Sequence, residues 1–366
     1  MRATAVGLSV SIASAALGQC APEIVAEVQT IGDVGGIALD ERGYLFVLDE
    51  GRGLVAFDIR DPSDPVAVGG FGWLYQPYYQ LELAGRYLFA FHDDGFQWAQ
   101  LSMLDVENPR SISYVDHLTH FCCEIGVAGD RLFVTYGRST GYYEIGSGAF
   151  DIGESGPRLR ESAYRISAQD LMMYATTLEG VVPIDFADPA GPRRYDPIVL
   201  GDWRGASHPE GSVLHVATAD GPFATVDVRV LAGPQILDQM DLAAVDLDVA
   251  DGVAVLAGSE VSVVDVSNPR ALRLVGSLGL PTEPVEVAIR KGVAFVATQR
   301  DVYVIDYAGC LPCLPDIDRS GVLDLFDFLE FQRLFSAGDV RGDFDGDGSL
   351  TVYDFVAFQN AFQAGC

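Results

Sequence analysis

The stretch Val261-Ser-Val-Val-Asp265-Val-Ser-Asn-Pro269 joins an apolar strand that ends in aspartate to a turn that contains proline. Leu54-Val-Ala-Phe-Asp58-Ile-Arg-Asp-Pro62 is a second clear copy of this unit. Seven copies can be placed along the chain, centred on Asp58, Asp105, Asp151, Asp185, Asp227, Asp265 and Asp306. They follow one another at spacings of 47, 46, 34, 42, 38 and 41 residues. We expect each aspartate to end a third strand and to fix its turn, since Asp side chains bond to nearby backbone N–H groups.

Each copy follows another short run of β-branched and aromatic residues, such as 44–48, 87–91 and 293–297, with Gly, Asp, Asn and Pro between the runs. A period near 40 residues with four short strands is typical of a β-propeller, because one such sheet cannot bury both of its faces alone. Amphipathic helical patterns are absent before residue 320, which disfavours a helical solenoid. The sequence predicts an all-β seven-bladed β-propeller over residues 19–309.

The repeats resemble the LVIVD-type propeller family, whose unit reads like Val263-Val-Asp265-Val-Ser-Asn-Pro269. The resemblance covers roughly residues 35–307 and is clearest in units one, two, six and seven. It implies a propeller, a fold that this family often uses in surface or secreted proteins. It implies no particular activity.

The last repeat stops at Tyr307 with no fourth strand after it, whereas the apolar run 23–29 precedes the first complete repeat. We expect this N-terminal strand to complete the last blade and close the ring, which removes an exposed edge. Antiparallel pairing would then bring Cys20 close to Cys310 and Cys313. A disulfide at this place would lock the closure.

Residues 1–18 are predicted to be a signal peptide, because Arg2 is followed by a short apolar stretch and by small residues at Ala16-Leu17-Gly18. The stretch is shorter than the roughly 20 residues that cross a bilayer, and no other segment is a candidate span. In an exported, extracellular protein the six cysteines are disulfide candidates: Cys20, Cys122, Cys123, Cys310, Cys313 and Cys366. The net charge of −29 disfavours nucleic acids and anionic membranes as partners.

After a Cys/Pro linker at 310–315, two acidic twelve-residue segments begin at Asp316 and Asp343, 27 residues apart. Ca²⁺ takes six to eight oxygen ligands, and EF-hand loops supply them from positions 1, 3, 5, 7, 9 and 12, with Gly at position 6. Both segments fit, with Asp in place of Glu at position 12. The sequence thus predicts two calcium sites, with Val322 and Ser349 acting through backbone carbonyls. The predicted ligands are Asp316, Asp318, Ser320, Val322, Asp324 and Asp327 in the first loop, and Asp343, Asp345, Asp347, Ser349, Thr351 and Asp354 in the second.

Each loop leads into a predicted helix, at 325–335 and 352–362, whose phenylalanines at i, i+3 and i+7 would pack the two helices together. Pro312 and Pro315 exclude a helix before the first loop. Loop then helix, twice, resembles a dockerin module over residues 316–366; a thrombospondin-type calcium repeat fits less well, because helices follow the loops. The resemblance implies docking onto a cohesin-like or cell-surface protein partner. The candidate contacts are the apolar residues Leu325, Phe326, Val352 and Tyr353.

The final Gly365-Cys366 resembles a dockerin variant that attaches exported proteins to the cell surface. Cys366 has a second interpretation, a disulfide with Cys310 or Cys313. The residues leave both interpretations open.

Within the propeller, Gln80, Glu124, Asp246 and Glu286 fall at one equivalent position of the repeats, before the innermost strands. They could ring the mouth of the central channel and bind a cation or polar ligand. The simpler interpretation, which we favour at this point, is that they are solvated acids at the entry of each strand.

A second group holds residue types that ligate metals: Asp116, His117, His120, Cys122 and Cys123. Its spacing matches no familiar zinc pattern, so disulfide chemistry is the favoured interpretation.

The chain contains no Gly-x-Ser-x-Gly elbow, His-Glu-x-x-His pair or phosphate-binding loop. We therefore expect a secreted, surface-tethered binding or scaffold protein. The alternative is a secreted hydrolase or lyase acting on polysaccharide, recruited to a complex by the C-terminal module. Aromatic residues that could stack on sugars, or belong to the core, are Trp73, Tyr75, Tyr78, Tyr79 and Trp98.

Overall fold

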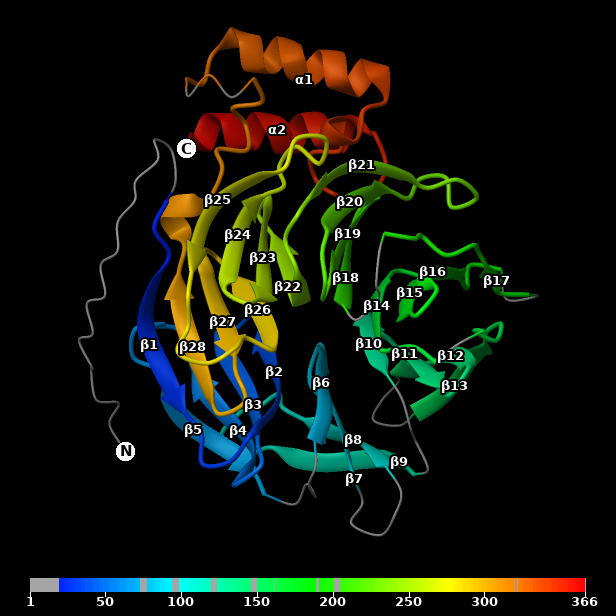
Figure 1. Ribbon diagram of the computed structural model, residues 1–366, viewed down its shortest axis with the longest axis vertical. Coiled ribbons are helices and arrows are strands. Elements are labelled where there is room, and N and C mark those ends of the chain that lie inside the picture. Colours follow the sequence, from blue (N-terminus) through cyan, green and yellow to red (C-terminus); the bar gives the residue numbers. More distant parts are fainter. Residues whose placement is uncertain are drawn as a thin grey trace.

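Seven four-stranded antiparallel sheets are arranged around a central axis in the computed structural model (Figure 1). The structure describes residues 20–72, 78–93, 99–119, 124–145, 150–160, 162–188, 191–200, 205–318, 320 and 322–365. The predicted signal peptide, residues 1–18, lies outside them. The seven sheets confirm the prediction of a seven-bladed β-propeller.

Each blade runs from an innermost strand at the axis to an outermost strand at the rim. Blades one to three are β2 (Val34–Asp40), β3 (Tyr44–Asp49), β4 (Gly53–Asp58), β5 (Val66–Phe71); β6 (Tyr78–Ala84), β7 (Tyr87–Asp93), β8 (Ala99–Asp105), β9 (Ser113–Thr119); and β10 (Ile125–Ala128), β11 (Arg131–Tyr136), β12 (Ser139–Ile145), β13 (Phe150–Ser155). Blades four and five are β14 (Arg165–Gln169), β15 (Met172–Thr177), β16 (Gly180–Asp185), β17 (Arg193–Arg194); and β18 (Gly205–Glu210), β19 (Val213–Thr218), β20 (Phe223–Asp227), β21 (Gln235–Met240). Blades six and seven are β22 (Ala244–Ala250), β23 (Val253–Gly258), β24 (Val261–Asp265), β25 (Arg273–Leu278); and β26 (Glu286–Arg290), β27 (Val293–Ala297), β28 (Asp301–Asp306), β1 (Glu23–Gln29).

The hydrophobic core lies between neighbouring blades. One cluster joins Phe46 and Leu54 of blade one to Leu88 and Leu104 of blade two, and a second joins blade one to blade seven. Since both faces of a blade are apolar, each blade is stable only with a neighbour on either side. The first and last blades therefore have to pack against each other, which closes the ring.

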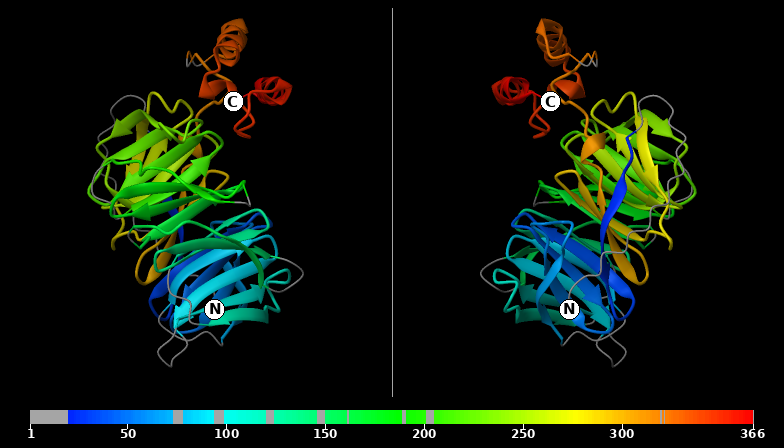
Figure 2. Two further views of the ribbon diagram at one scale, coloured as in Figure 1. Left: turned by 90° about the vertical axis from the view of Figure 1, so that its right-hand side faces the viewer. Right: turned by 90° about the vertical axis from the view of Figure 1, so that its left-hand side faces the viewer.

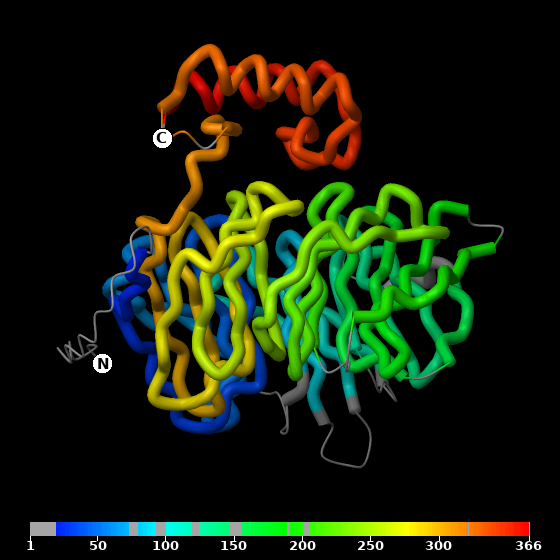
Figure 3. Tube along the Cα trace, turned by 45° about the horizontal axis from the view of Figure 1, so that its top comes forward, coloured from blue at the N-terminus to red at the C-terminus, as the bar shows by residue number. Residues whose placement is uncertain are grey.

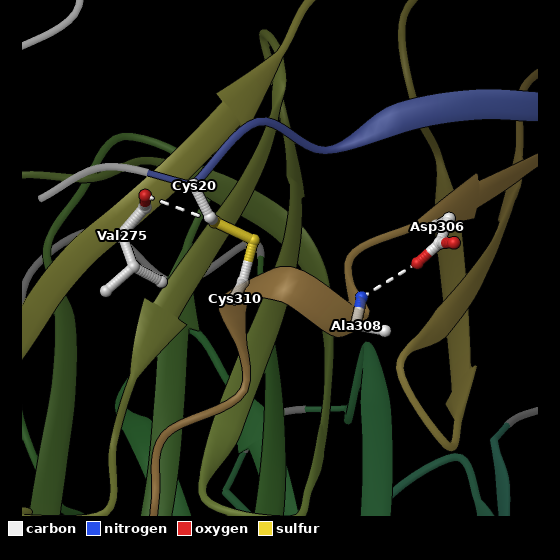
Figure 4. The surroundings of a disulfide bond; sticks show 5 residues. All are labelled: Cys20, Val275, Asp306, Ala308 and Cys310. Atoms are coloured by element: carbon white, nitrogen blue, oxygen red, sulfur yellow. Dashed lines mark hydrogen bonds between the residues drawn. A yellow bond between two sulfur atoms is a disulfide. The ribbon is translucent and has the colours of Figure 1, made fainter.

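Closure is made by the N-terminal strand β1, which pairs antiparallel with β28 from Glu23↔Asp306 to Gln29↔Asp301 (Figure 1). Just before β1, a disulfide joins Cys20 to Cys310, with the Cα atoms 5.2 Å apart (Figure 4). The Cys20 backbone N–H also donates to Val275 of blade six at 2.8 Å. The predicted strand closure and the disulfide across it are both confirmed.

Cys313 is disulfide-bonded as well. Its partner is not among the described residues, and neither are Cys122, Cys123 and Cys366. Since Cys310 is bonded to Cys20, the predicted alternative that pairs Cys366 with Cys310 is excluded.

Six of the seven repeat aspartates end a third strand as expected. In each of the six, the carboxylate accepts the N–H of the residue two positions on, at 2.8–3.2 Å, and this bond shapes the following turn. Asp151 was assigned wrongly, because it lies in the fourth strand β13. Glu144 of β12 occupies the equivalent position, opposite Arg131 as Asp58 is opposite Tyr44.

The C-terminal module holds the two expected helices, α1 (Leu325–Ala337) and α2 (Val352–Ala364), each two residues longer than predicted. Short 3₁₀ turns, η1 (Ala308–Cys310) and η2 (Val340–Gly342), precede the two loops. The rings of Phe331 and Phe358 stack with centroids 4.5 Å apart, which confirms the predicted phenylalanine contact between the helices. Figure 2 shows the helix pair projecting beyond one end of the propeller. Within the described part of the chain, no helix combines the length and apolar character that a membrane span requires.

Candidate functional site

The two acidic loops of the module fold in the same way. The position-9 residues Asp324 and Thr351 are the N-caps of α1 and α2, accepting N–H bonds from Phe326 at 2.7 Å and from Tyr353 at 3.1 Å. Three residues on, Asp327 and Asp354 return a bond to the N-cap backbone and complete a capping box in each helix. The spacing Asp/Thr-x-x-Asp therefore sets where each helix begins.

The position-12 carboxylates are fully buried and hold each loop against its helix. Asp327 accepts N–H bonds from Asp324 at 2.9 Å and from Asp318 at 3.3 Å. Asp354 accepts the corresponding bonds from Thr351 at 2.7 Å and from Asp345 at 3.3 Å. The 27-residue repeat of the sequence thus corresponds to the same hydrogen bonds recurring in both loops.

Three carboxylates gather in each loop, with oxygens within 4.8 Å of one another. They are Asp316, Asp318 and Asp327 in the first loop, and Asp343, Asp345 and Asp354 in the second. The Oδ1 atom of Asp343 is buried without a hydrogen-bond partner, whereas its Oδ2 accepts the Gly348 N–H at 2.9 Å. Burial, followed by the nearby carboxylates of Asp354, Asp347 and Asp345, raises the pKa of Asp343 to about 6.

These features fit a hard divalent cation that prefers oxygen ligands. Among the remaining predicted ligands, Ser320, Asp324, Asp347 and Thr351 have side chains in local hydrogen bonds. Ser320 Oγ donates to the Val322 carbonyl at 3.2 Å, and Asp347 accepts the Ser349 N–H at 2.7 Å.

A second polar site lines the channel of the propeller, a cavity of about 410 Å³. Strand register places one residue in, or directly before, every innermost strand at an equivalent level, each opposite the fifth residue of the second strand. These residues are Gly36, Gln80, Glu124, Arg165, Ala206, Asp246 and Glu286. The four polar residues predicted to share a level do share it.

For Gln80, Asp246 and Glu286, the interpretation as solvated residues at the strand entry is wrong. Gln80 Oε1 accepts the N–H of Ile125 in blade three at 3.0 Å. Asp246 accepts the Val287 N–H of blade seven at 2.9 Å, and Glu286 accepts the Ile37 N–H of blade one at 3.1 Å. Because the free edge of an innermost strand needs acceptors for its N–H groups, these side chains bridge neighbouring blades.

Arg165 stands at the same level in blade four, and sequence reasoning missed it. Its Nη1 lies 2.7 Å from Asp246 Oδ1. The next level holds Glu82, with His208 paired to Asp248 at 3.1 Å. An alignment of blade four on the other repeats would have revealed Arg165.

Three glutamates at the channel have raised pKa values. Burial raises the pKa of Glu82 to about 8 and that of Glu124 to about 7, while Arg165 opposes both shifts. Burial and then the charge of Asp246 raise the pKa of Glu286 to about 8. At neutral pH the channel therefore carries fewer negative charges than its carboxyls would suggest.

The predicted metal-type group is only partly described. Asp116 and His117 lie on β9, the outermost strand of blade two, where the His117 ring bonds to the Tyr114 hydroxyl. His120, Cys122 and Cys123 lie outside the described residues, as do Trp73, Tyr75 and Trp98.

Comparisons with known proteins agree with the architecture. The LVIVD repeat model matches residues 31–71 and 244–279, which lie in blades one and six. Among curated proteins, none matches the chain.

Solved structures with the same fold include the crystal structure of RRP9 WD40 repeats, at 9% identity and TM-score 0.59, over 78% of this chain and 97% of that one. The structure of U3-55K matches at 8% identity and TM-score 0.61, over 78% and 98%. The computationally designed Ika8 protein matches at 9% identity and TM-score 0.55, over 76% and 98%. At these identities the likeness shows the propeller fold alone.

Proposed function

We propose that this chain is an exported propeller that acts as a binding or scaffold protein, and that residues 316–366 form a dockerin-like module with two calcium sites that attaches it to a protein partner or cell surface. The observation that carries the proposal is the pair of matching carboxylate clusters, 27 residues apart, together with the unpartnered Oδ1 atom of Asp343. A calcium ion would satisfy that atom and neutralise the crowded charges.

Asp316, Asp318 and Asp327 would hold one ion, and Asp343, Asp345 and Asp354 the other, supplemented by the remaining loop oxygens. The ions would supply positive charge that fixes each loop at the start of its helix.

Attachment is supported by an exposed apolar surface on the module. Leu325, Phe326, Val352 and Tyr353 begin the two helices and are each 66–68% exposed, while Leu329 and Val356 extend the surface along the helices. Apolar side chains gathered in this way are typical of protein interaction sites. Export is supported by the Cys20–Cys310 disulfide directly after the predicted signal peptide, because such bonds persist in oxidising compartments.

Calcium titration of the metal-free protein by isothermal calorimetry tests the module. We expect two sites in the wild type, and Asp316→Asn or Asp343→Asn to weaken one site each by at least about tenfold, because each removes a charged ligand. Calcium at about 100 times its Kd should add about 2.7 kcal/mol per occupied site to the stability of the module.

The matched control is Glu330→Gln on α1, which removes an acid that pairs with Arg333 outside the loops. This variant should bind both ions as the wild type does. Absence of calcium binding by the wild type, or equal weakening by Glu330→Gln, would contradict the calcium proposal.

The alternative function is cleavage of polysaccharide, by hydrolysis or by elimination. It is supported by the raised pKa values of Glu124 and Glu286, which suit general acids. Against it, the Glu286 carboxylate is bonded to the backbone of the next blade. We expect the purified protein to release no sugar from a polysaccharide panel, with or without calcium, measured as reducing ends and unsaturated products. Turnover lost in Glu286→Gln would establish the enzyme instead.

A further inference from the structure

The second acidic loop lies against the propeller. Gly211, in the turn between β18 and β19 of blade five, has no room for a side chain on this side. A Cβ atom there would lie 2.9 Å from the carbonyl oxygen of Gly346 and 3.2 Å from Asp343 Oδ2. The backbone of blade five is therefore in direct contact with the loop that carries the second carboxylate cluster.

Two arginines of the propeller extend this contact. Arg229, just after β20, donates from Nη1 to the Gly338 carbonyl at the end of α1, at 2.5 Å, and from Nη2 to Asp227 at 2.6 Å. Arg270, in the turn after β24, lies 3.9 Å from Asp339. In Figure 3 the module lies over the blades coloured green to yellow, which include these turns.

The same interface encloses a cavity of about 460 Å³ with acidic walls on both sides. His215 of blade five lines it, 1% exposed and with both ring nitrogens lacking a hydrogen bond; Nε2 lies 3.4 Å from Glu210. The carboxylates around the cavity are Glu210, Asp251 and Asp265 from the propeller and Asp316, Asp343 and Asp345 from the module, with Arg273 and Arg341 as the arginines of its described lining. Facing charges of one sign repel, and a divalent cation in the second loop would reverse that repulsion.

We infer that the partner of the second loop is the chain's own propeller: the loop docks on the β18–β19 turn of blade five, and calcium in this loop couples to that docking. The inference rests on the proposed calcium binding. In this arrangement the second loop is held on the propeller. The apolar surface at the starts of the two helices is left for other partners. Because coupling is reciprocal, docking must strengthen calcium binding at the second loop by the same factor by which calcium strengthens docking, and loss of docking weakens calcium binding by at most that factor.

Gly211→Ala in the full-length protein tests the coupling. Gly129→Ala is the matched control, because Gly129 occupies the equivalent turn of blade three with nearly the same φ, +59° against +55°, and nothing lies within 4 Å of its Cβ position. Both variants carry the same backbone strain, and only one meets the loop. By calorimetry we expect Gly211→Ala to weaken one of the two calcium sites at least about fivefold, and Gly129→Ala to weaken neither.

A second pair of variants guards against a failure of Gly211→Ala to fold. Arg229→Gln removes the contact with Gly338, whereas Arg60→Gln removes the equivalent arginine of blade one, which pairs with Asp58 two residues before it. Weakening of one calcium site is expected in the first variant and not in the second.

Hydrogen exchange gives an independent readout on the propeller. Calcium should slow exchange of amides 210–213 in blade five and leave amides 128–131 of blade three unchanged. Two bound ions, with no difference within either pair of variants and no protection of 210–213, would overturn the docking inference and leave the calcium module intact. Absence of calcium from both loops would overturn both.

Discussion

Replacing both Cys20 and Cys310 by serine is expected to lower the free energy of unfolding of the propeller by about 3–5 kcal/mol. The bond joins residues 290 positions apart, so it restricts the unfolded chain across nearly the whole propeller. The cost of closing so long a loop grows with its length, which makes this disulfide the most stabilising kind. Urea unfolding followed by far-UV circular dichroism measures the loss.

The bond also holds β1 in place. Without it, β1 is kept in blade seven by its pairing with β28 and by the few side chains that it buries, such as Val28. Detachment of β1 would expose the edge of β28 and the apolar interface with blade one. We therefore expect the double variant to aggregate more readily as well as to unfold at lower urea.

Reduction of the wild type supplies the control. Dithiothreitol also reduces the bond of Cys313, so it should bring the reduced wild type close to the reduced double variant. Equal stability of the oxidised wild type and the double variant would mean that strand pairing alone closes the ring.

Arg165→Gln is expected to lower the free energy of unfolding at pH 7.5 by about 2–3 kcal/mol. This loss is smaller than for a fully buried ion pair, because the Arg165 side chain is 36% exposed to the channel. Among the described residues lining the channel, Arg165 carries the one permanent positive charge. It opposes the raised pKa values of Glu82, Glu124 and Glu286. Its loss leaves these acids and Asp246 without compensation.

The deficit should depend on pH. A carboxyl whose pKa is higher in the folded chain holds its proton more tightly there, so its contribution to stability is complete below the unfolded pKa of about 4.3. That contribution is lost as the pH rises through the folded value, about 7 for Glu124 and about 8 for Glu82 and Glu286. We therefore expect Arg165→Gln to be close to the wild type at pH 5.5 and furthest from it at pH 8.5, measured by thermal melts.

Two variants separate this effect from a general loss of charge. Arg300→Gln removes an 81% exposed arginine and should cost less than about 1 kcal/mol at any pH. Glu286→Gln keeps an acceptor for the Ile37 N–H and should flatten the pH dependence of the wild type. A deficit of Arg165→Gln that does not change between pH 5.5 and 8.5 would show that the arginine acts by packing rather than by charge.

The blade count could be predicted because each blade carries its own local signal: an apolar strand, an aspartate and a turn. The repeat pattern was misassigned once, at Asp151, since blade three has Glu144, one residue before the end of its third strand, at this position. The uneven spacings of 46 and 34 residues on either side of Asp151 indicate this misassignment. Glu144 lies 39 residues after Asp105 and 41 before Asp185, which restores the period.

The channel was harder to predict. The level shared by Gln80, Asp246 and Glu286 is visible in the repeats, but their bonds go to the backbone of the next blade. Those partners are set by how two sheets pack, which local sequence does not encode. Solvation was therefore the natural interpretation of an acid near a strand entry, and it was wrong.

Periodic patterns alone decide the seven blades, the strand that closes them and the two acidic loops, because strand alternation, turn residues and loop spacing act over a few neighbouring residues. Three features appear only in the folded chain: the Arg165–Asp246 pair, the bonds between blades, and the contact of Gly211 with the second loop. Each joins residues between 41 and 249 positions apart. Their energies depend on burial and on distance in space, and both are set when the ring closes and the module settles on blades five and six.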